Sequence, residues 1–404
     1  MKVLQINSYY QYGSTGKIVY DIDKYIRQNK ICSYVCYAWD TGFDKNDDTI
    51  YFKYGNIVEK YIGALLTRLT GNRYGYSWLE TKRLVHFIKK NKPDIVHIHC
   101  VNSYDLNIYN LLLFLKKESI PTVITEHAEF FHTGNCPYAF DCEKWVNGCG
   151  KCDNLYYSTK SKFVDRTAKN WNKMKSAFKE FEKCVLTPVS PWLCSRTQRS
   201  GITSQIRAKT ILNGINTDIF RNYSSDEIPK NIKGIFTKKS VLFVTSDFNA
   251  EIKGGKYVIE LAKQLKDYNF IIVCNAKINV KVSNIIHIPY ISNQVELAQY
   301  YSLADVTLLC SKRETFSMVV AESLSCGTPV VGFKAGGPES ISIDKYSTFV
   351  EYGDINELKK SLISWISNDV DKENISKEAK EKYSSDTMGK NYLALYRELA
   401  ENDE

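Results

Sequence analysis

The sequence predicts an α/β protein built from two similar halves. Short runs rich in β-branched and aromatic residues alternate with longer segments of helical periodicity, a pattern typical of parallel sheets covered by helices. This alternation occurs twice along the 404 residues, and the polar stretch 221–239 lies between the two series. At roughly 150 residues per domain, the length suits two or three domains.

Five strands are predicted in each half. They cover 2–7, 32–38, 94–99, 122–125 and 184–190 in the first half, and 241–245, 270–275, 285–289, 305–311 and 328–333 in the second. Helical periodicity is clear at 18–28 and 255–265. The turn-forming pair Asn213-Gly214 precedes the polar stretch, so we place the connection between the halves in this region. We expect an N-terminal domain at 1–190, a C-terminal domain at 212–385 and a helix at 386–404 that packs back on the first domain.

The composition favours a soluble protein with anionic partners. Hydrophobic residues make up 44% and charged residues 25%, close to globular averages, and no apolar run approaches the roughly 18 residues that span a bilayer. Lysine and arginine number 54 against 45 acidic residues, and this net charge of +9 is too diffuse to indicate a nucleic-acid-binding protein. The first residues alternate like a strand and lack the layout of a signal peptide, so we expect a cytoplasmic protein with reduced cysteines.

Two carboxylates enclose the most informative segment. Gly327 and Pro329 mark a helix stop, so the sequence predicts a helix at 316–326 with Glu314 in the loop before its positive end. Such an end suits a phosphate group. At about 1.5 Å per residue, Glu314 and Glu322 lie at most roughly 12 Å apart, comparable to the reach from sugar to ribose in a nucleotide sugar. The spacing alone equally suits an amphipathic helix with solvated glutamates.

Glycines follow two of the predicted strands. Lys253 stands beside Gly254 at a predicted helix start, where its charge suits a diphosphate oxygen, although a solvated lysine gives the same pattern. Gly13 and Gly16 follow the strand 2–7 and permit a tight turn with its amides exposed, but they match neither a P-loop nor a dinucleotide-binding motif.

The segment from Glu314 to Glu322, with the Cys-Gly-Thr-Pro-Val-Val that follows it and Ala-Gly-Gly-Pro-Glu at 335–339, resembles the Glu-x7-Glu signature region of the retaining glycosyltransferases of family 4. Matches at 93–99, 213–220 and Lys253-Gly254 stand in the order of that family and extend the resemblance over nearly the whole length. It implies a GT-B fold: two facing Rossmann-like domains with the active site in the interdomain cleft.

The resemblance also implies roles for single residues. Glu314 would contact hydroxyls of the donor sugar, Glu322 the ribose, and Lys253 the diphosphate. His127, at the end of the strand 122–125, would face the donor sugar, with packing in its loop as the alternative and Glu126 beside it as a weaker candidate. Glu314, His127 and Lys253 form the expected catalytic set. The expected donor-binding residues are Gly13, Gly16, Lys253, Glu314, Thr315, Phe316, Ser317 and Glu322.

The chain departs from the family pattern at two places. Thr315 and Ser317 stand where members often have glycines, which predicts a tighter sugar pocket. Asp247 stands where an arginine commonly precedes the lysine, and Arg313 or Lys312 is the candidate for a substitute cation.

Histidines and cysteines add two further groups. His97 and His99 alternate along a strand, and we expect both in the core without a catalytic role. Four cysteines in the loop 132–153 suit a structural zinc site, while packed free thiols and a disulfide are the alternatives. A subset of polysaccharide-building family members carries a similar loop near the acceptor side. The four cysteines of this loop in the present chain are Cys136, Cys142, Cys149 and Cys152.

The segment 160–183 is basic, with eight Lys or Arg and three Asp or Glu. Four large apolar residues recur in this segment at helical spacing: Trp171, Met174, Phe178 and Phe181. We expect these four side chains to lie in the core and the lysines to face water. The alternative is an anionic membrane surface that would hold the enzyme at the inner face of the membrane, near a lipid-linked acceptor.

These observations predict a cytoplasmic retaining glycosyltransferase. It would move a sugar from a nucleoside diphosphate donor to a saccharide or lipid-linked saccharide acceptor in bacterial surface polysaccharide synthesis, with no cofactor for catalysis. The Asp-x-Asp match at 369–371 is interpreted as a solvated turn, not a metal site.

Two alternatives to the predicted function remain. One is a sugar-nucleotide epimerase of the same fold, and the other, with less support, is a zinc-clustered nucleic-acid-binding protein. We expect no nucleic-acid partner.

Overall fold

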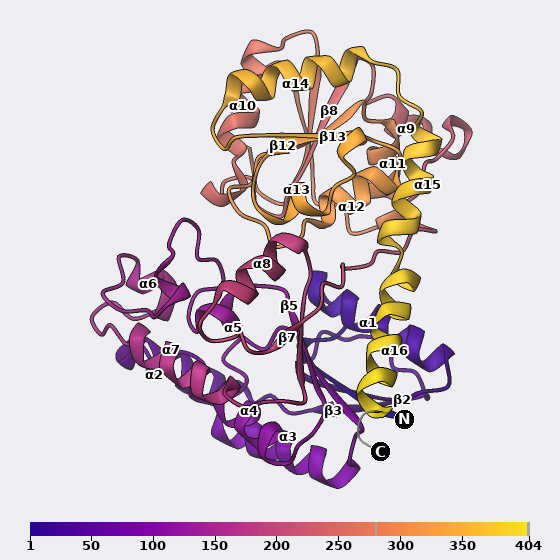
Figure 1. Cartoon of the computed structure of the whole chain (residues 1–404). Helices are drawn as coiled ribbons and strands as arrows, with labels where there is room; N and C mark the ends of the chain where they lie inside the picture. The colour runs from indigo at the N-terminus through magenta and orange to yellow at the C-terminus, as the bar shows by residue number, and fades with distance from the viewer. Residues whose placement is uncertain (279–280, 402–404) are drawn as a thin grey trace. The chain divides into compact units, whose positions relative to one another are not determined.

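The computed structural model describes residues 1–278 and 281–401, which form two compact units (Figure 1). Unit 1 comprises Met1–Leu212 together with the C-terminal residues from Met388, and unit 2 comprises Asn213–Thr387. The chain enters unit 2 at Asn213, so the polar stretch 221–239 belongs to unit 2 and 191–212 belongs to unit 1. Residues 402–404 of the expected C-terminal helix lie outside the described residues.

The described residues of unit 1 form a seven-stranded parallel sheet with the order β3-β2-β1-β4-β5-β6-β7. The central strands are buried on both faces, which explains their continuous apolar character. The register pairs Lys2 with Cys32 and Val3 with Ile95. The strands are β1 (Lys2–Tyr9), β2 (Cys32–Trp39), β3 (Thr49–Lys53), β4 (Ile95–Ile98), β5 (Thr122–Glu126), β6 (Cys184–Pro188) and β7 (Arg207–Ala208).

Helices cover both faces of this sheet. The final helix, α16 (Ser385–Glu401), buries Tyr392 and Tyr396 in one core cluster with Val3 of β1 and with helix α1. The other helices of unit 1 are α1 (Gly13–Gln28), α2 (Ile57–Thr70), α3 (Trp78–Asn91), α4 (Ile108–Lys117), α5 (Phe130–Thr133), α6 (Leu155–Thr159), α7 (Thr167–Phe178) and α8 (Pro191–Arg199).

The described residues of unit 2 repeat the same topology with six parallel strands in the order β10-β9-β8-β11-β12-β13. Its strands are β8 (Ser240–Val244), β9 (Asn269–Val273), β10 (Ile285–Ile288), β11 (Val306–Leu309), β12 (Val330–Phe333) and β13 (Ser347–Val350). Its helices are α9 (Lys230–Lys233), α10 (Gly255–Gln264), α11 (Gln294–Leu303), α12 (Met318–Ser325), α13 (Gly337–Ile341), α14 (Ile355–Ser367) and α15 (Lys372–Tyr383). Two Rossmann-like sheets are therefore present, and the predicted α/β class is confirmed.

The segment 160–183 is not one helix. Helix α7 covers Thr167–Phe178, and the four predicted apolar residues, Trp171, Met174, Phe178 and Phe181, are buried as expected. Because its large apolar side chains point into the core, α7 presents lysines to solvent without the apolar face that an interfacial helix needs. Within the described residues, no helix combines the length and apolarity needed to cross a bilayer.

Candidate functional site

The candidate residues of unit 2 lie where the strand order reverses. In open α/β sheets ligands bind beyond the carboxyl ends of the strands at this switch point. The reversal falls between β8 and β11 in unit 2, and between β1 and β4 in unit 1. Lys253 lies in the loop after β8 and Glu314 in the loop after β11, so the topology brings them to one position in the sheet.

Lys253 and Glu314 form an ion pair. The Lys253 Nζ lies 2.6 Å from the Glu314 Oε1, and the Ser311 hydroxyl donates to the same oxygen at 2.9 Å. Both charged side chains are partly buried. The Lys312 amide donates to the Ile252 carbonyl at 2.8 Å, which ties the two loops together beside the pair. This arrangement offers one cation and one carboxylate to a ligand at the switch point.

Glycines allow the two loops to approach each other. Gly254 adopts a φ of +72°, and a Cβ there would lie 2.2 Å from the Cys310 carbonyl oxygen. Any other residue would push the loop after β8 away from the end of β11. The position of Lys253 therefore depends on the glycine that follows it.

The helix after Glu314 begins later than predicted. Helix α12 starts at Met318, because Ser317 has a φ of 98° and turns the chain just before it. Phe316 and Ser317 therefore precede the helix, although the sequence predicted its start at 316. Both are buried, as is Thr315. The Gly337 amide donates to the Glu314 carbonyl at 2.9 Å and fixes the backbone of this turn.

Glu322 lies on α12 and is held by a neighbouring helix. The buried hydroxyl of Tyr301, from α11, donates to the Glu322 Oε2 at 3.0 Å. Burial, together with the negative charge of Glu322, raises the pKa of Tyr301 well above its usual value. The tyrosine therefore stays a donor at every physiological pH and orients the carboxylate.

In unit 1 the two predicted glycines shape the start of α1. Gly13 has a φ of +67° and is the first residue of the helix. Gly16 packs so closely on the loop after β1 that a Cβ would lie 3.3 Å from both the Gln11 nitrogen and the Tyr9 oxygen. The Gln11 amide donates to the Gly16 carbonyl at 3.0 Å. These contacts place the first turn of α1 at the switch point of unit 1.

His127 follows β5 and is partly buried. Its Nε2 lies 3.4 Å from the Nδ1 of His99, and burial lowers the pKa of His127 to about 4. The imidazole is therefore neutral near pH 7 and suits hydrogen bonding better than proton donation. His97 and His99 are core residues as predicted: His97 contacts the Tyr396 hydroxyl at 2.6 Å, and His99 contacts the Gln5 Oε1 at 3.2 Å.

Beside His127 the structure shows a buried charged cluster that the sequence did not indicate. His132 lies 3.0 Å from Glu126 and 3.6 Å from Glu129, and Arg196 pairs with Glu129. Burial alone favours the neutral imidazole, but the two carboxylates outweigh it and raise the pKa of His132 to about 8. The sequence offered Glu126 as a weak candidate, and the partner Arg196 is too far along the chain for spacing to identify it.

The four loop cysteines line one cavity of about 220 Å³. Burial and the neighbouring thiols raise the pKa of Cys149 to about 12, and the same causes raise that of Cys136. Within 1–278 and 281–401, no group of three or more His, Cys, Asp or Glu side chains is arranged to hold a metal ion. The thiols suit zinc chemically, but they do not form a ready-made site.

The predicted Asp-x-Asp segment has a structural role. The Asp371 side chain accepts a hydrogen bond from the Asn374 amide at 3.0 Å and caps helix α15. Both aspartates are exposed.

Two family models match the chain, one in each unit. The family described as Glycosyltransferase Family 4 matches residues 32–219, and the family described as Glycosyl transferases group 1 matches residues 225–382. One relative is WcaC from Escherichia coli K12, whose name describes a colanic acid biosynthesis glycosyl transferase. It is 20% identical to this chain, and the match covers 99% of this chain and 100% of WcaC.

Solved structures share the fold at low sequence identity. The sucrose-phosphate synthase of Thermosynechococcus elongatus has a TM-score of 0.69 at 13% identity and covers 98% of both chains. Anabaena HepE, solved in complex with UDP-glucose, has a TM-score of 0.65 at 15% identity and covers 98% of this chain and 100% of its own. With the two family matches and the two Rossmann-like sheets, this chain belongs to the glycosyltransferases of the GT-B type.

Proposed function

We propose that this protein is a retaining, metal-independent glycosyltransferase of surface polysaccharide synthesis. It takes a sugar from a nucleoside diphosphate donor and passes it to a saccharide or lipid-linked saccharide acceptor, in the cytoplasm at the inner face of the membrane. The observation that carries the proposal is the Lys253–Glu314 pair at the switch point of unit 2. A UDP-sugar is the first donor to test, because the similar Anabaena structure holds UDP-glucose.

The reaction needs no side-chain nucleophile. The acceptor hydroxyl attacks the anomeric carbon on the face from which the diphosphate leaves. The bond from this carbon to the phosphate oxygen breaks, a bond to the acceptor oxygen forms, and the acceptor proton passes to the leaving phosphate. The configuration is therefore retained.

Stabilisation of the departing diphosphate carries most of the acceleration in this proposal. Lys253 supplies the positive charge, and the amides around Thr315, Phe316 and Ser317 at the start of α12 supply hydrogen bonds. When the donor enters, Lys253 exchanges its contact with Glu314 for a phosphate oxygen. Glu314 then accepts hydrogen bonds from sugar hydroxyls, and Glu322, oriented by Tyr301, accepts them from the ribose.

In this proposal, residues of unit 1 also contact the donor. The amides of the first turn of α1, near Gly13 and Gly16, approach the donor phosphate. The neutral His127 donates or accepts a hydrogen bond at the donor sugar, which its lowered pKa permits at pH 7.

We also propose that a structural zinc ion binds the four loop cysteines. The support is that all four line one cavity, and that burial and the neighbouring thiols raise the pKa of Cys136 and Cys149, a cost that a divalent cation would offset. Because the thiols are not already grouped as ligands, binding would draw the loop together. No step of the reaction passes through this ion.

The function is tested by incubating the purified chain with UDP-, GDP- and ADP-sugars, with and without saccharide acceptors. We expect one donor class to be used, an acceptor-dependent product with the donor's anomeric configuration, and activity that persists in EDTA. An inverted product, or loss of activity in EDTA with recovery on adding magnesium or manganese, contradicts the mechanism. An altered nucleotide sugar formed without acceptor indicates an epimerase.

A further inference from the structure

Helix α2 exposes the apolar side of its surface. Six of its large apolar side chains are between 50 and 69% exposed, while the helix buries Gly63 and Thr67. Contiguous apolar surface of this kind marks a site of interaction, unlike the single exposed residues found on every protein. The six, which we call the α2 face, are Ile57, Val58, Tyr61, Ile62, Leu65 and Leu69.

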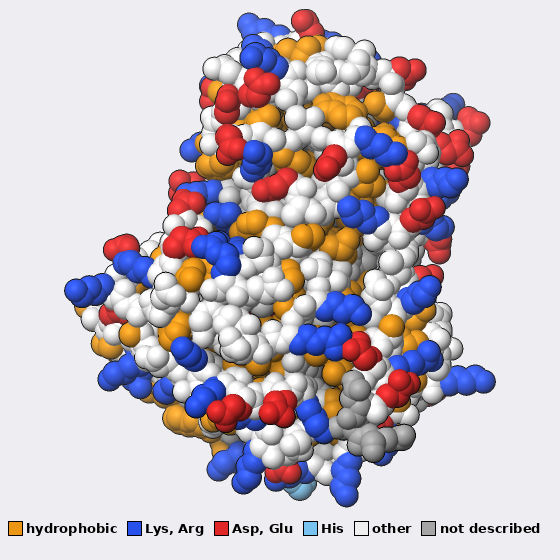
Figure 2. Space-filling view, in the orientation of Figure 1, with side chains coloured by type: hydrophobic (Ala, Val, Ile, Leu, Met, Phe, Trp, Pro, Cys, Tyr) orange, Lys and Arg blue, Asp and Glu red, His pale blue; other side chains and the backbone are white. Residues whose placement is uncertain are grey.

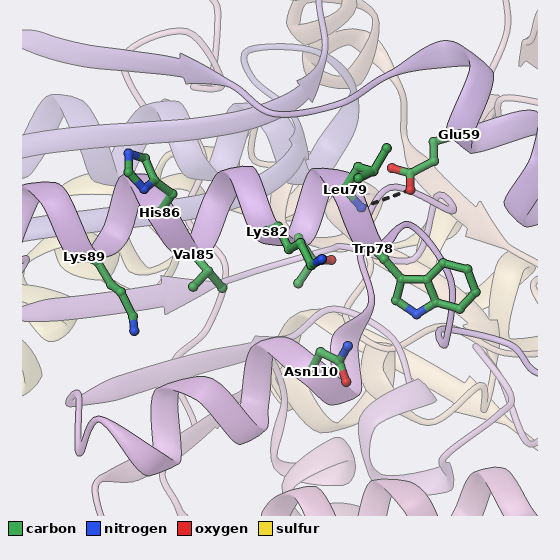
Figure 3. Close-up of a pocket in the computed structure, with 9 residues that line it drawn as sticks. Glu59, Trp78, Leu79, Lys82, Val85, His86, Lys89 and Asn110 are labelled. Atoms are coloured by element: carbon green, nitrogen blue, oxygen red, sulfur yellow. Dashed lines mark hydrogen bonds between the residues drawn. The ribbon is translucent and has the colours of Figure 1, made fainter.

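The apolar surface continues onto the start of α3. Glu59 of α2 accepts hydrogen bonds from the amides of Leu79 at 3.0 Å and Glu80 at 3.1 Å, which fixes the two helices together. Leu79 and its neighbour Trp78 are both exposed. Figure 3 shows Trp78 beside this contact, at an open hollow of about 760 Å³ that is also lined by Lys82 and Lys89.

The surface also extends past the other end of α2. Gly71, which ends the helix, packs on the loop before α7: a Cβ there would lie 2.8 Å from the Val164 carbonyl oxygen. Asn170 donates to the Gly71 carbonyl at 2.8 Å and secures this contact. The loop presents Phe163, which is 90% exposed, an unusual position for a phenylalanine in water.

Positive charge surrounds these apolar side chains. The segments 57–70, 78–91 and 160–164 contain eight Lys or Arg and two Asp or Glu. Of the two acids, Glu59 is engaged with the start of α3, and Glu80 is buried. Nearby Asp165 accepts from the Cys152 amide at 2.8 Å and from Thr167. Figure 2 shows lysines and arginines among hydrophobic side chains on the side of unit 1 where α6 and α7 are labelled in Figure 1.

We infer that the α2 face, with Trp78, Leu79 and Phe163, binds an anionic membrane surface. Apolar and aromatic side chains flanked by cations are what a helix lying in the interface of an anionic bilayer requires. A second copy of the chain would bring the same cations face to face, which disfavours a symmetric dimer here. The inference rests on the proposed function for its lipid-linked acceptor, but membrane binding is measured without any reaction.

The site differs from the one expected in the sequence. The apolar residues of α7 are buried, whereas those of α2 are exposed. Lys160 and Lys162 of the predicted segment still take part, because they flank Phe163.

The test is flotation of the purified full chain with vesicles of phosphatidylcholine alone or mixed with phosphatidylglycerol. We expect binding to the mixed vesicles, weaker binding at high salt, and little binding to phosphatidylcholine. The double variant Leu65→Asp/Leu69→Asp should lower the apparent affinity by about tenfold or more, because two apolar side chains no longer enter the bilayer. Both positions are exposed, so folding should survive.

Tyr290→Asp, at an exposed aromatic residue of unit 2, is the matched control and should bind like the wild type. Equal binding of the double variant and the wild type overturns the inference, as does absence of binding by the folded wild type. A wild-type dimer that the double variant converts to a monomer overturns it in favour of a second copy. Donor hydrolysis by the double variant, expected at the wild-type level, separates a failure of this inference from a failure of the proposed function.

Discussion

Lys253 and Glu314, 61 residues apart in the sequence, meet with 2.6 Å between Nζ and Oε1. The loops that carry them are joined by the Lys312 amide and by the close approach of Gly254 to Cys310. The pair is therefore positioned by backbone contacts as well as by its own attraction. The exchange of partners that we propose for Lys253, from carboxylate to phosphate, would then require no large movement of either loop.

Lys253→Ala should reduce the rate of sugar transfer by about 10² or more, the scale for losing one preorganised charge partner of a leaving group. Lys256→Ala removes an exposed lysine three residues further on and serves as the control. The measurement is kcat with saturating donor and acceptor. Near-normal kcat in Lys253→Ala would remove this lysine from the proposed mechanism.

Glu322→Ala should weaken nucleotide binding by about 1 to 3 kcal/mol, because ribose hydroxyls and the buried Tyr301 hydroxyl both lose their acceptor. Tyr301→Phe should cause a smaller loss, about 0.5 to 1.5 kcal/mol, since the carboxylate remains but is less well oriented. Isothermal titration with the nucleoside diphosphate measures both. Glu351→Ala, at an exposed carboxylate beyond β13, is the control; equal affinities for all these variants would place Glu322 outside the site.

Much of the fold could be predicted because buried parallel strands such as β4 and β5 are short apolar runs between helical segments. The missed strands are β3, β7 and β13, which are all edge strands. Thr49–Lys53 is partly exposed, and Arg207–Ala208 has two residues, so neither carries the apolar signal of a central strand. The start of α12 could not be predicted, because nothing in the sequence requires a positive φ at Ser317.

The candidate site was predictable where local sequence carries the chemistry and not where contacts are distant. Glu314 and Glu322 were singled out by the resemblance of their segment to family 4, since their spacing alone also suits solvated glutamates, and Lys253 by the same resemblance and the glycines beside it. Tyr301 is an ordinary residue of a helix in sequence, and its contact with Glu322 depends on how two helices pack. The exposure of α2 was hidden for the same reason, since periodicity shows an apolar face but not what covers it.

Metal analysis of the purified chain should find about one zinc per chain if the loop cysteines form a closed structural site. Cys149→Ser should release the metal and loosen the loop, as seen by faster proteolysis between Cys136 and Cys152. Cys194→Ser, on helix α8 and outside the cavity, should keep the metal. A folded, metal-free protein with four titratable thiols in the loop would falsify the zinc proposal.

The buried cluster around His132 predicts a pH dependence of stability. The pKa of His132 is raised from 6.5 to about 8, so the protonated imidazole stabilises the folded state fully below pH 6.5, and this contribution is lost as the pH rises through 8. The shift corresponds to about 2 kcal/mol. Comparing denaturant unfolding of the wild type and His132→Gln at pH 6 and pH 9 isolates the effect, and the advantage of the wild type should shrink by about this amount at the higher pH. Glu126→Gln removes one of the two carboxylates and should make the pH dependence smaller; an advantage that stays constant or grows with pH means that His132 is neutral in the fold.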